Sequence, residues 1–224
     1  MQKKLLSALL VLAFVTGALL FTAKADADIP AVKDAEDVYE LAEDAMFYMK
    51  ALRSDGTIRA TGSGVMIDAK GIAATAYHVV KGADKLEAVF PDGRVLKGVT
   101  VLKYDELTDA AVLQFPGGNK AAYAALPIRS SALKAGEQVF ALGYPLKETL
   151  IVTEGIVNHP KAKINGRNRI LTSAQIVSGM SGGPLIDRYG RLVGIISGSM
   201  RTMDNIHLVL DMEDLQKVRQ PAAK

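Results

Sequence analysis

Three side chains in the sequence, those of His78, Asp109 and Ser181, could together carry out nucleophilic catalysis. A serine hydroxyl is a weak nucleophile on its own, so it needs a base that takes its proton and an acid that orients the base. Asp105 is the nearest rival for the acid, but Asp109 directly precedes an apolar segment, residues 110–115, that is typical of a buried strand. The three residue types therefore predict attack of Ser181 on a carbonyl carbon.

Residues 179–185 (GMSGGPL) surround the candidate nucleophile with glycine. Glycines on both sides of Ser181 let the backbone turn sharply and approach a substrate closely. Such a turn can aim the N–H groups of Gly179 and Ser181 at one point, and an oxyanion hole needs two donors of this kind. The segment also reads G-x-S-x-G, as in α/β-hydrolases, where a helix follows the serine and the order is Ser, Asp, His. Here a hairpin signal follows at 188–190 and only His207 comes after Ser181, so the esterase alternative is disfavoured.

The amino-acid composition limits which classes of protein this chain can belong to. The chain has 224 residues, of which 49% are hydrophobic, and this suits one or two compact domains with a core. The formal net charge of +3 comes partly from Lys3, Lys4 and Lys24, so the remainder is close to neutral and no nucleic-acid partner is expected. Because cysteine is absent, a thiolate metal site and a disulfide framework are excluded, and no metal or cofactor is predicted. Aromatic residues make up only 6%, which predicts an aliphatic core.

The N-terminus carries a targeting signal. Two lysines precede an apolar run over residues 5–21, and small residues follow it. The pattern predicts a secretory signal peptide over residues 1–27, cleaved after Ala25 or Ala27, and hence a periplasmic or secreted protein. The run is about 17 residues long, close to the lower limit for crossing a bilayer. An uncleaved membrane anchor is therefore the alternative, and it is the only membrane association expected.

The rest of the chain is predicted to be rich in β-strands. Residues 28–45 are expected to be a helical lead-in, and a solvated helix is favoured over a contact arm for assembly. Short apolar runs separated by turn signals then indicate two β-rich halves, 46–120 and 121–212, with a linker at 116–131. Residues 213–224 are expected to be a C-terminal helix and tail, with Asp211 as the N-cap. The expected strands are residues 46–52, 57–60, 64–67, 86–90, 94–101, 110–115, 138–142, 149–158, 169–175, 184–187, 192–197 and 207–210, with Asn165 and Gly166 at a hairpin tip.

Six segments, in chain order, resemble motifs of the trypsin-like peptidases, and most closely those of their HtrA-type branch. The resemblance covers roughly residues 46–212, and six motifs in the correct order are far more specific than any one of them. The segments are residues 61–65 (TGSGV), 74–80 (ATAYHVV), 107–113 (LTDAAVL), 140–145 (FALGYP), 152–157 (VTEGIV) and 179–185 (GMSGGPL).

The resemblance implies an all-β fold of two six-stranded antiparallel β-barrels, a chymotrypsin-like double barrel, with a helix at each end. It also implies a serine endopeptidase that acts on polypeptides. His78 and Asp109 would come from the first barrel and Ser181 from the second, and the three would meet in the cleft between them. Ser181 would be the nucleophile, His78 the base and Asp109 the residue that orients the imidazole. His159 and His207 are interpreted as structural or surface residues.

Substrate-binding positions also follow from the resemblance. Ser197 would donate a hydrogen bond to Asp109, and the strand through Ser197, Gly198 and Ser199 would pair with the substrate backbone. Gln175, Ile176 and the following Val177 would form a wall of the primary specificity pocket. No acid occupies the base of that pocket, so small to medium apolar side chains are predicted and Lys or Arg is not.

Two features depart from the family pattern. Met180 replaces the aspartate that precedes the nucleophile in the digestive enzymes, so activation through a new N-terminal ammonium group is not expected; HtrA-type enzymes usually have asparagine there. Only about forty residues follow Ser181, too few for a peptide-binding PDZ domain of that branch. A homotrimer, frequent in the branch, is left open. The alternative function is a catalytically silent module that binds peptides or protein partners in the same cleft, and the complete triad disfavours it.

Overall fold

The computed structural model describes residues 31–117, 123–147, 149–199 and 203–219. The predicted signal peptide lies outside the described residues. No helix within the described ranges is both long and apolar enough to cross a membrane. Lys33 and the residues after it make up one compact unit, which holds all the elements considered below.

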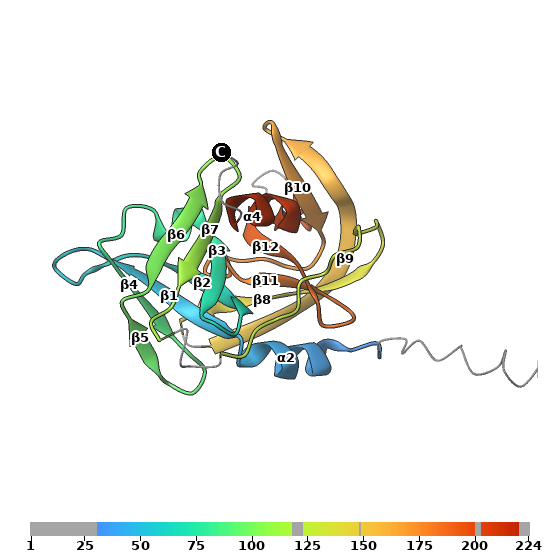
Figure 1. The fold of residues 1–224 in the computed structure, drawn as a ribbon. Coiled ribbons are helices and arrows are strands. Elements are labelled where there is room, and N and C mark those ends of the chain that lie inside the picture. The colour runs from blue at the N-terminus through green and yellow to red at the C-terminus, as the bar shows by residue number, and fades with distance from the viewer. Residues whose placement is uncertain (1–30, 118–122, 148, 200–202, 220–224) are drawn as a thin grey trace, which may run out of the picture. The chain divides into compact units, whose positions relative to one another are not determined.

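The first half of this unit is a seven-stranded antiparallel sheet (Figure 1). Its order is β5-β4-β1-β2-β3-β7-β6, so it runs from β5 at one end to β6 at the other instead of closing as a six-stranded barrel. The expected strand at 94–101 is two strands, because Gly98 has a left-handed φ of +76° that ends the first. The strands are β1 (Met46–Leu52), β2 (Ile58–Asp68), β3 (Ile72–Ala76), β4 (Lys85–Val89), β5 (Val95–Lys97), β6 (Thr100–Asp105) and β7 (Ala110–Gln114).

The second half is a closed six-stranded barrel with the order β10-β13-β12-β11-β8-β9. Asn165 and Gly166 join β9 to β10 with φ angles of +49° and +77°, as a tight hairpin turn with two left-handed residues requires. Closure removes the free strand edges, so every strand of this half has two neighbours. The strands are β8 (Gln138–Leu146), β9 (Thr149–Ile164), β10 (Arg167–Thr172), β11 (Pro184–Asp187), β12 (Leu192–Ser199) and β13 (His207–Asp211).

A helix stands at each end of the described chain, as the sequence predicts. Helix α2 (Ala35–Glu43) begins at Asp34, whose carboxylate accepts the N–H groups of Glu36 and Asp37 in a capping box. Its buried Val38 and Ala42 show that α2 is not a fully solvated lead-in, because the helix packs on β8 and β9 (Figure 1). Helix α4 (Met212–Arg219) packs against β6 and β7 of the first half and β12 and β13 of the second.

Two hydrophobic clusters form the core. One fills the interior of the closed barrel and is almost entirely aliphatic, as expected. The other fills the first sheet and extends to residues of β8, β11 and β12. The few aromatic residues are concentrated in this second cluster, where the rings of Phe47 and Phe115 lie 4.8 Å apart, edge to face. Most buried residues of this cluster are aliphatic as well, and the aromatic rings form one group within it.

The predicted linker connects the halves through its backbone. The N–H group of Leu126 donates to Met66 of β2, and the N–H group of Arg129 donates to Leu192 of β12. Leu126 is buried, so this segment is part of the core and not a loose connection. It is hydrogen-bonded to both β2 and β12, strands that also carry Ser63 and Ser197.

Candidate active site

The structure brings His78 and Asp109 into direct contact. Strands β3 and β7 are neighbours in the sheet, and Ala76 pairs with Ala110. His78 follows β3 in the short helix α3 (Tyr77–Val80), and Asp109 precedes β7, so the pairing places the two side by side. The backbone N–H group of His78 donates to Asp109 Oδ1 at 2.9 Å, and His78 Nδ1 lies 2.9 Å from Asp109 Oδ2.

Asp109 has an unusual backbone conformation, with a φ of +67°. The left-handed region is uncommon outside glycine, although aspartate tolerates it better than most residues. In this conformation its carbonyl oxygen accepts the N–H group of Tyr77 while its carboxylate accepts that of His78. The Ser197 hydroxyl donates to Asp109 Oδ2 at 2.6 Å. Backbone strain of this kind persists where surrounding contacts hold the residue in place.

The carboxylate of Asp109 stays charged. Its side chain is only 12% exposed, and burial alone would raise its pKa; the hydrogen bond and charge of His78, together with the Ser197 hydroxyl, outweigh burial and lower the pKa. A carboxylate can only accept, so the proton of a neutral His78 ring sits on Nδ1, and Nε2 carries a lone pair. The His78 side chain is 48% exposed, so that lone pair can take a proton from a partner.

Ser181 lies beside the helix that carries His78. Its carbonyl oxygen accepts the N–H group of Ser63 on β2 at 2.8 Å. A Cβ atom added to Gly62 would lie 2.8 Å from that same carbonyl oxygen and 2.7 Å from a side-chain carbon of Val79. Because Val79 is adjacent to His78, one position on β2 touches both sides of the candidate triad.

The turn that carries Ser181 leaves two N–H groups without acceptors. Within it, the N–H groups of Met180, Gly182 and Gly183 donate to carbonyl oxygens of Val177, Ile196 and Met180, respectively. The N–H groups of Gly179 and Ser181 donate to no described residue. Gly179 has a φ of +95°, and a Cβ there would lie 2.7 Å from Tyr144 O and Pro145 Cα, so this position requires glycine.

The expected substrate-binding residues also lie together. The Ser199 hydroxyl donates to the carbonyl oxygen of Ile176 at 3.0 Å, which joins the end of β12 to the predicted pocket wall. The carbonyl oxygen of Gln175 accepts the Thr153 hydroxyl at 2.7 Å. A Cβ added to Gly198 would meet nothing within 4 Å. The space above the backbone of Gly198 is therefore open, so a bound group could approach this part of the strand closely.

Comparison with known proteins decides the family. A family model described as the trypsin-like peptidase domain matches residues 62–195, which is more than half of the chain. This chain belongs to the trypsin-like peptidase family. The structure resembles the crystal structure of the serine endoprotease from Yersinia pestis with a TM-score of 0.73 and 29% identity, over 84% of this chain and 66% of that one. The predicted chymotrypsin-like double barrel is thereby confirmed, with the first barrel present as the seven-stranded sheet.

Relatives within the family carry names of the predicted branch. The serine endoprotease DegS of Escherichia coli is 37% identical over 145 residues, covering 62% of this chain and 39% of the relative. A protein of Hahella chejuensis, named as a DegP-like periplasmic serine endoprotease, is 36% identical over 146 residues, 62% of this chain and 30% of that protein. The resemblance to HtrA-type trypsin-like peptidases is thus confirmed. The chain spans about two fifths, or less, of the length of these relatives.

Several polar residues of this trypsin-like site had no role assigned from the sequence. Ser63 and Thr75 are fully buried on β2 and β3 and hydrogen-bond beside the Ser181 turn. Arg169 on β10 is 3% exposed; burial lowers its pKa, and the charges of Asp109 and Asp214 act in the opposite direction. Ser63 stands inside the TGSGV motif, so its position was marked in the sequence. Nothing in the sequence marked Arg169, since only the barrel topology brings it near Asp109.

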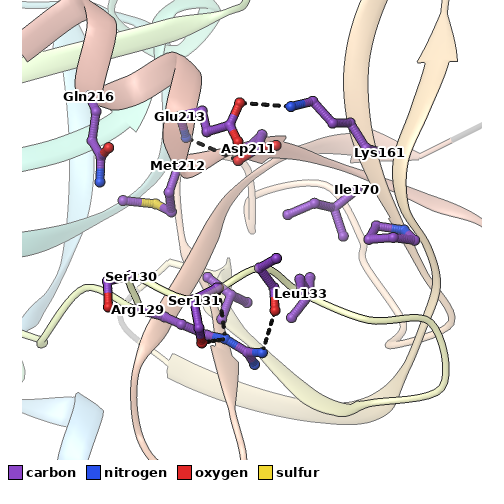
Figure 2. A pocket seen from close by; sticks show the side chains of 13 residues that line it. Arg129, Ser130, Ser131, Leu133, Lys161, Ile170, Asp211, Met212, Glu213 and Gln216 are labelled. Carbon is purple, nitrogen blue, oxygen red and sulfur yellow. Dashed lines mark hydrogen bonds and ion pairs between the residues drawn. The ribbon is translucent and has the colours of Figure 1, made fainter.

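A separate hollow is lined by residues other than His78, Asp109 and Ser181 (Figure 2). Its volume is about 530 Å³, and it is lined by the end of the linker, by β9 and β10, and by the start of α4. Lys161 pairs with Glu213 at its rim, and burial raises the pKa of Asp211. None of the predicted catalytic residues lines it. In the described ranges, no cluster of three or more His, Asp or Glu residues is arranged to hold a metal ion.

Proposed function

We propose that the chain is an exported serine endopeptidase that hydrolyses peptide bonds through His78, Asp109 and Ser181. The observation that carries the proposal is the contact of His78 Nδ1 with Asp109, a carboxylate that also accepts the Ser197 hydroxyl. This arrangement fixes the tautomer that leaves Nε2 as a base. The position of the Ser181 turn against β2, beside α3, supports the nucleophile's role.

In this proposal each residue performs one step of acyl transfer. Ser181 Oγ attacks the peptide carbonyl carbon while His78 Nε2 takes its proton, and Asp109 stabilises the imidazolium that forms. The N–H groups of Gly179 and Ser181 stabilise the negative oxygen of the tetrahedral intermediate. His78 then gives the proton to the leaving amine, which departs. A water molecule releases the acyl group from Ser181 by the same steps.

The substrates in this proposal are polypeptides. The strand through Ser197, Gly198 and Ser199 pairs with the substrate backbone, and Gln175 and Ile176 bound the primary pocket. Export follows from the predicted signal peptide over residues 1–27, in keeping with the DegP-like relative that is named periplasmic. A homotrimer stays a prediction, for which sedimentation of the purified protein is the direct measurement.

A fluorophosphonate probe tests the nucleophile. The probe reacts only with a serine activated by a base, so we expect covalent labelling of the wild-type protein and none of the Ser181→Ala variant. Mass spectrometry of tryptic peptides should place the label on Ser181. Absence of labelling of folded wild-type protein would contradict the proposal and favour the alternative, a module that binds peptides in the same cleft.

The pair Asp109→Asn and Asp105→Asn tests the acid. Asparagine tolerates a left-handed φ and fits the same space, but it presents an amide to His78 and favours the wrong tautomer. We expect Asp109→Asn to lower kcat roughly 10⁴-fold, as a change of tautomer does in this type of triad. Asp105 caps its own turn by accepting the N–H group of Leu107, so Asp105→Asn should retain kcat within about twofold. If kcat fell equally in both variants, Asp109 would have no special role as the acid of the triad.

A further inference from the structure

The Ser181 turn needs an anchor that its own sequence does not supply. Gly179 and Gly182 both have left-handed φ angles, of +95° and +87°, and glycine loses more conformational freedom on ordering than any other residue. Met180 is fully buried among the aliphatic side chains of the barrel, and it offers no charge or hydrogen bond. The Met180 side chain therefore does not hold the turn, and among the described residues the carbonyl oxygens of Gly179 and Ser181 accept no hydrogen bond from within it.

Ser63 on β2 supplies contacts to both ends of the turn. Its hydroxyl lies 2.8 Å from the carbonyl oxygen of Gly179, and its backbone N–H group donates to the carbonyl oxygen of Ser181 at 2.8 Å. The Ser63 hydroxyl also accepts the backbone N–H group of Tyr144 at 2.8 Å. A carbonyl oxygen can only accept, so the single hydroxyl proton must point at Gly179. The direction of this hydrogen bond is therefore fixed.

The remaining groups of Ser63 leave it no freedom to move. Its carbonyl oxygen accepts the Thr75 hydroxyl at 2.7 Å, and the residue is 0% exposed. A Cβ on Gly182 would lie 2.1 Å from that same carbonyl oxygen, so the turn is pressed directly against the strand. Ser63 thus lies in the sheet of the first half and hydrogen-bonds a turn of the second half. The two segments are more than a hundred residues apart in the chain.

These contacts fix two peptide groups of the turn, which alternate with the peptide groups that carry the N–H groups of Gly179 and Ser181. The Gly179–Met180 peptide is held by Ser63 at its oxygen and by Val177 at its N–H group. The Ser181–Gly182 peptide is held by Ser63 at its oxygen and by Ile196 at its N–H group. With both held, the N–H groups of Gly179 and Ser181 are the two that stay free. They can then converge on one oxyanion without reorganising during the reaction.

We propose that Ser63 is the positioning residue that holds the oxyanion-binding turn in its catalytic shape, in place of a charge at position 180. The proposal rests on the proposed function, because an oxyanion hole matters only if Ser181 attacks a carbonyl. It answers what orders this turn when Met180 cannot accept an ammonium group. Ser63 does not touch substrate, and it acts through the peptide groups of Gly179 and Ser181.

Kinetics of the Ser63→Ala variant test the proposal. Removing the hydroxyl frees the Gly179 carbonyl, so the donors are misplaced but not deleted. Deleting one such donor lowers kcat by about 10²–10³, and we expect Ser63→Ala to lower it roughly 10- to 100-fold while KM changes less than about threefold. Binding of a peptide boronate, which forms a tetrahedral adduct on the serine, should weaken by a similar factor. Binding of the cleaved product peptide should not.

Thr172→Val is the matched control. Thr172 is also fully buried, and its hydroxyl also accepts a backbone N–H group, from Ala174, and donates to a carbonyl oxygen, that of Ile156. The Thr172→Val variant should lose as much thermal stability as the Ser63→Ala variant, but its kcat should stay within about twofold of wild type. If both variants lost kcat to the same extent, Ser63 would have only a structural role. That result would overturn the proposal.

Two further outcomes separate this inference from the proposed function. If the fluorophosphonate probe fails to label wild type, the proposed function fails; if it labels wild type and Ser63→Ala at equal rates, only the role of Ser63 fails. Should Ser63→Ala not fold, Ser63→Cys replaces it, because a thiol is a weaker donor of similar shape. Its kcat should then lie clearly below wild type with KM unchanged. A Ser63→Cys variant with wild-type kcat would overturn the proposal.

Discussion

His207 is a buried histidine whose charge state is tied to folding. It is 4% exposed, and its Nδ1 atom lies 3.1 Å from the Ser199 hydroxyl oxygen. That hydroxyl gives its proton to the carbonyl oxygen of Ile176, so Nδ1 must carry the ring proton and donate it. Nε2 is buried and has no partner among the described residues. Burial lowers the pKa of His207, because a second proton would place an uncompensated charge inside the barrel.

Acid should therefore destabilise the protein through His207. Since the folded-state pKa lies below the unfolded value of about 6.5, the contribution is fully present above that pH and is lost as the pH falls towards the folded pKa. We expect the urea midpoint of wild type to fall between about pH 7.5 and about pH 5.5, and to fall less in His207→Gln. His159→Gln, at an exposed histidine, should behave as wild type.

The titration of Asp109 affects stability in a lower pH range, so it does not interfere with the test of His207. Its pKa is also lowered, so its contribution to stability is present above the unfolded value of about 3.9 and is lost only below it. A wild-type midpoint that is equal at both pH values would contradict the role of His207.

Single residues differ in how far the sequence reveals them. His78, Asp109 and Ser181 could be selected because their types and neighbouring motifs are specific. The left-handed φ of Asp109 could not, because it results from contacts with a helix 31 positions earlier in the chain. For His207 the sequence left a structural and a surface position open, and the structure places it in the buried interior. An alternating strand pattern does not tell which face lies inside a closed barrel.

At the scale of elements, Asp187 joins the linker to the β11–β12 hairpin. Its carboxylate is 1% exposed and pairs with Arg191 at 2.8 Å and with Arg129 at 3.3 Å. The N–H groups of Tyr189 and Arg191 also donate to it, so it closes the hairpin turn. Arg129 is 8% exposed and also pairs with Glu137. The buried carboxylate thus joins the linker to the hairpin, and Arg129 connects both to Glu137.

Asp187→Ala should therefore be strongly destabilising. It leaves the buried Arg129 guanidinium with one acid fewer and the hairpin without its cap, and breaking a buried pair on one side costs about 3–5 kcal/mol. Urea unfolding followed by circular dichroism measures the change. The exposed pair of Lys161 and Glu213 is the comparison, and Glu213→Gln should leave the midpoint within error. Similar losses in both variants would show that burial does not decide the strength of these pairs.

Most elements could be located from turn signals and apolar runs. Strands β1 and β11 have the predicted bounds, and α2 and α4 lie where predicted. Strand β3 was missed, because Ile72–Ala76 consists mostly of alanine and lacks an alternating pattern. Strand β9 continues beyond the predicted end and through Pro160, since its pairing with β10 extends to the hairpin at Asn165. The strands that pair with β3 and β9 determine where these two strands begin and end. Because the partner strands lie elsewhere in the chain, the local sequence does not reveal these bounds.

At the scale of the whole unit, the site depends on how the two sheets meet. Strand β2 contacts β8, β3 contacts β12, and α4 packs on strands of both halves. His78 and Asp109 come from the first half and Ser181 from the second, so in the proposed function neither half holds the triad alone. The double barrel could be predicted through the resemblance. The contacts across it could not, because they depend on the register of strands from both halves.

Gly62→Ala tests this junction without touching a catalytic side chain. The backbone of Gly62 suits alanine, but the added Cβ would lie 2.8 Å from the Ser181 carbonyl oxygen and 2.7 Å from Val79 Cγ2. The Val79 side chain can shift, whereas the Ser181 backbone can yield only by moving away from β2 and weakening its bond to Ser63 N–H. Misplacement of a nucleophile by about 1 Å can cost about 10²-fold, so we expect a fall in kcat of at least tenfold.

Gly64→Ala on the same strand separates this effect from simple overpacking. A Cβ there would lie 2.2 Å from the Phe47 ring, inside the first-half core, and its three nearest atoms all belong to that ring. It should lower thermal stability through overpacking while kcat of the folded fraction stays near wild type. If Gly64→Ala lost kcat as strongly as Gly62→Ala, the loss would come from general loosening of the sheet. If only Gly62→Ala lost it, the close approach of β2 to the Ser181 turn is what aligns the two halves for catalysis.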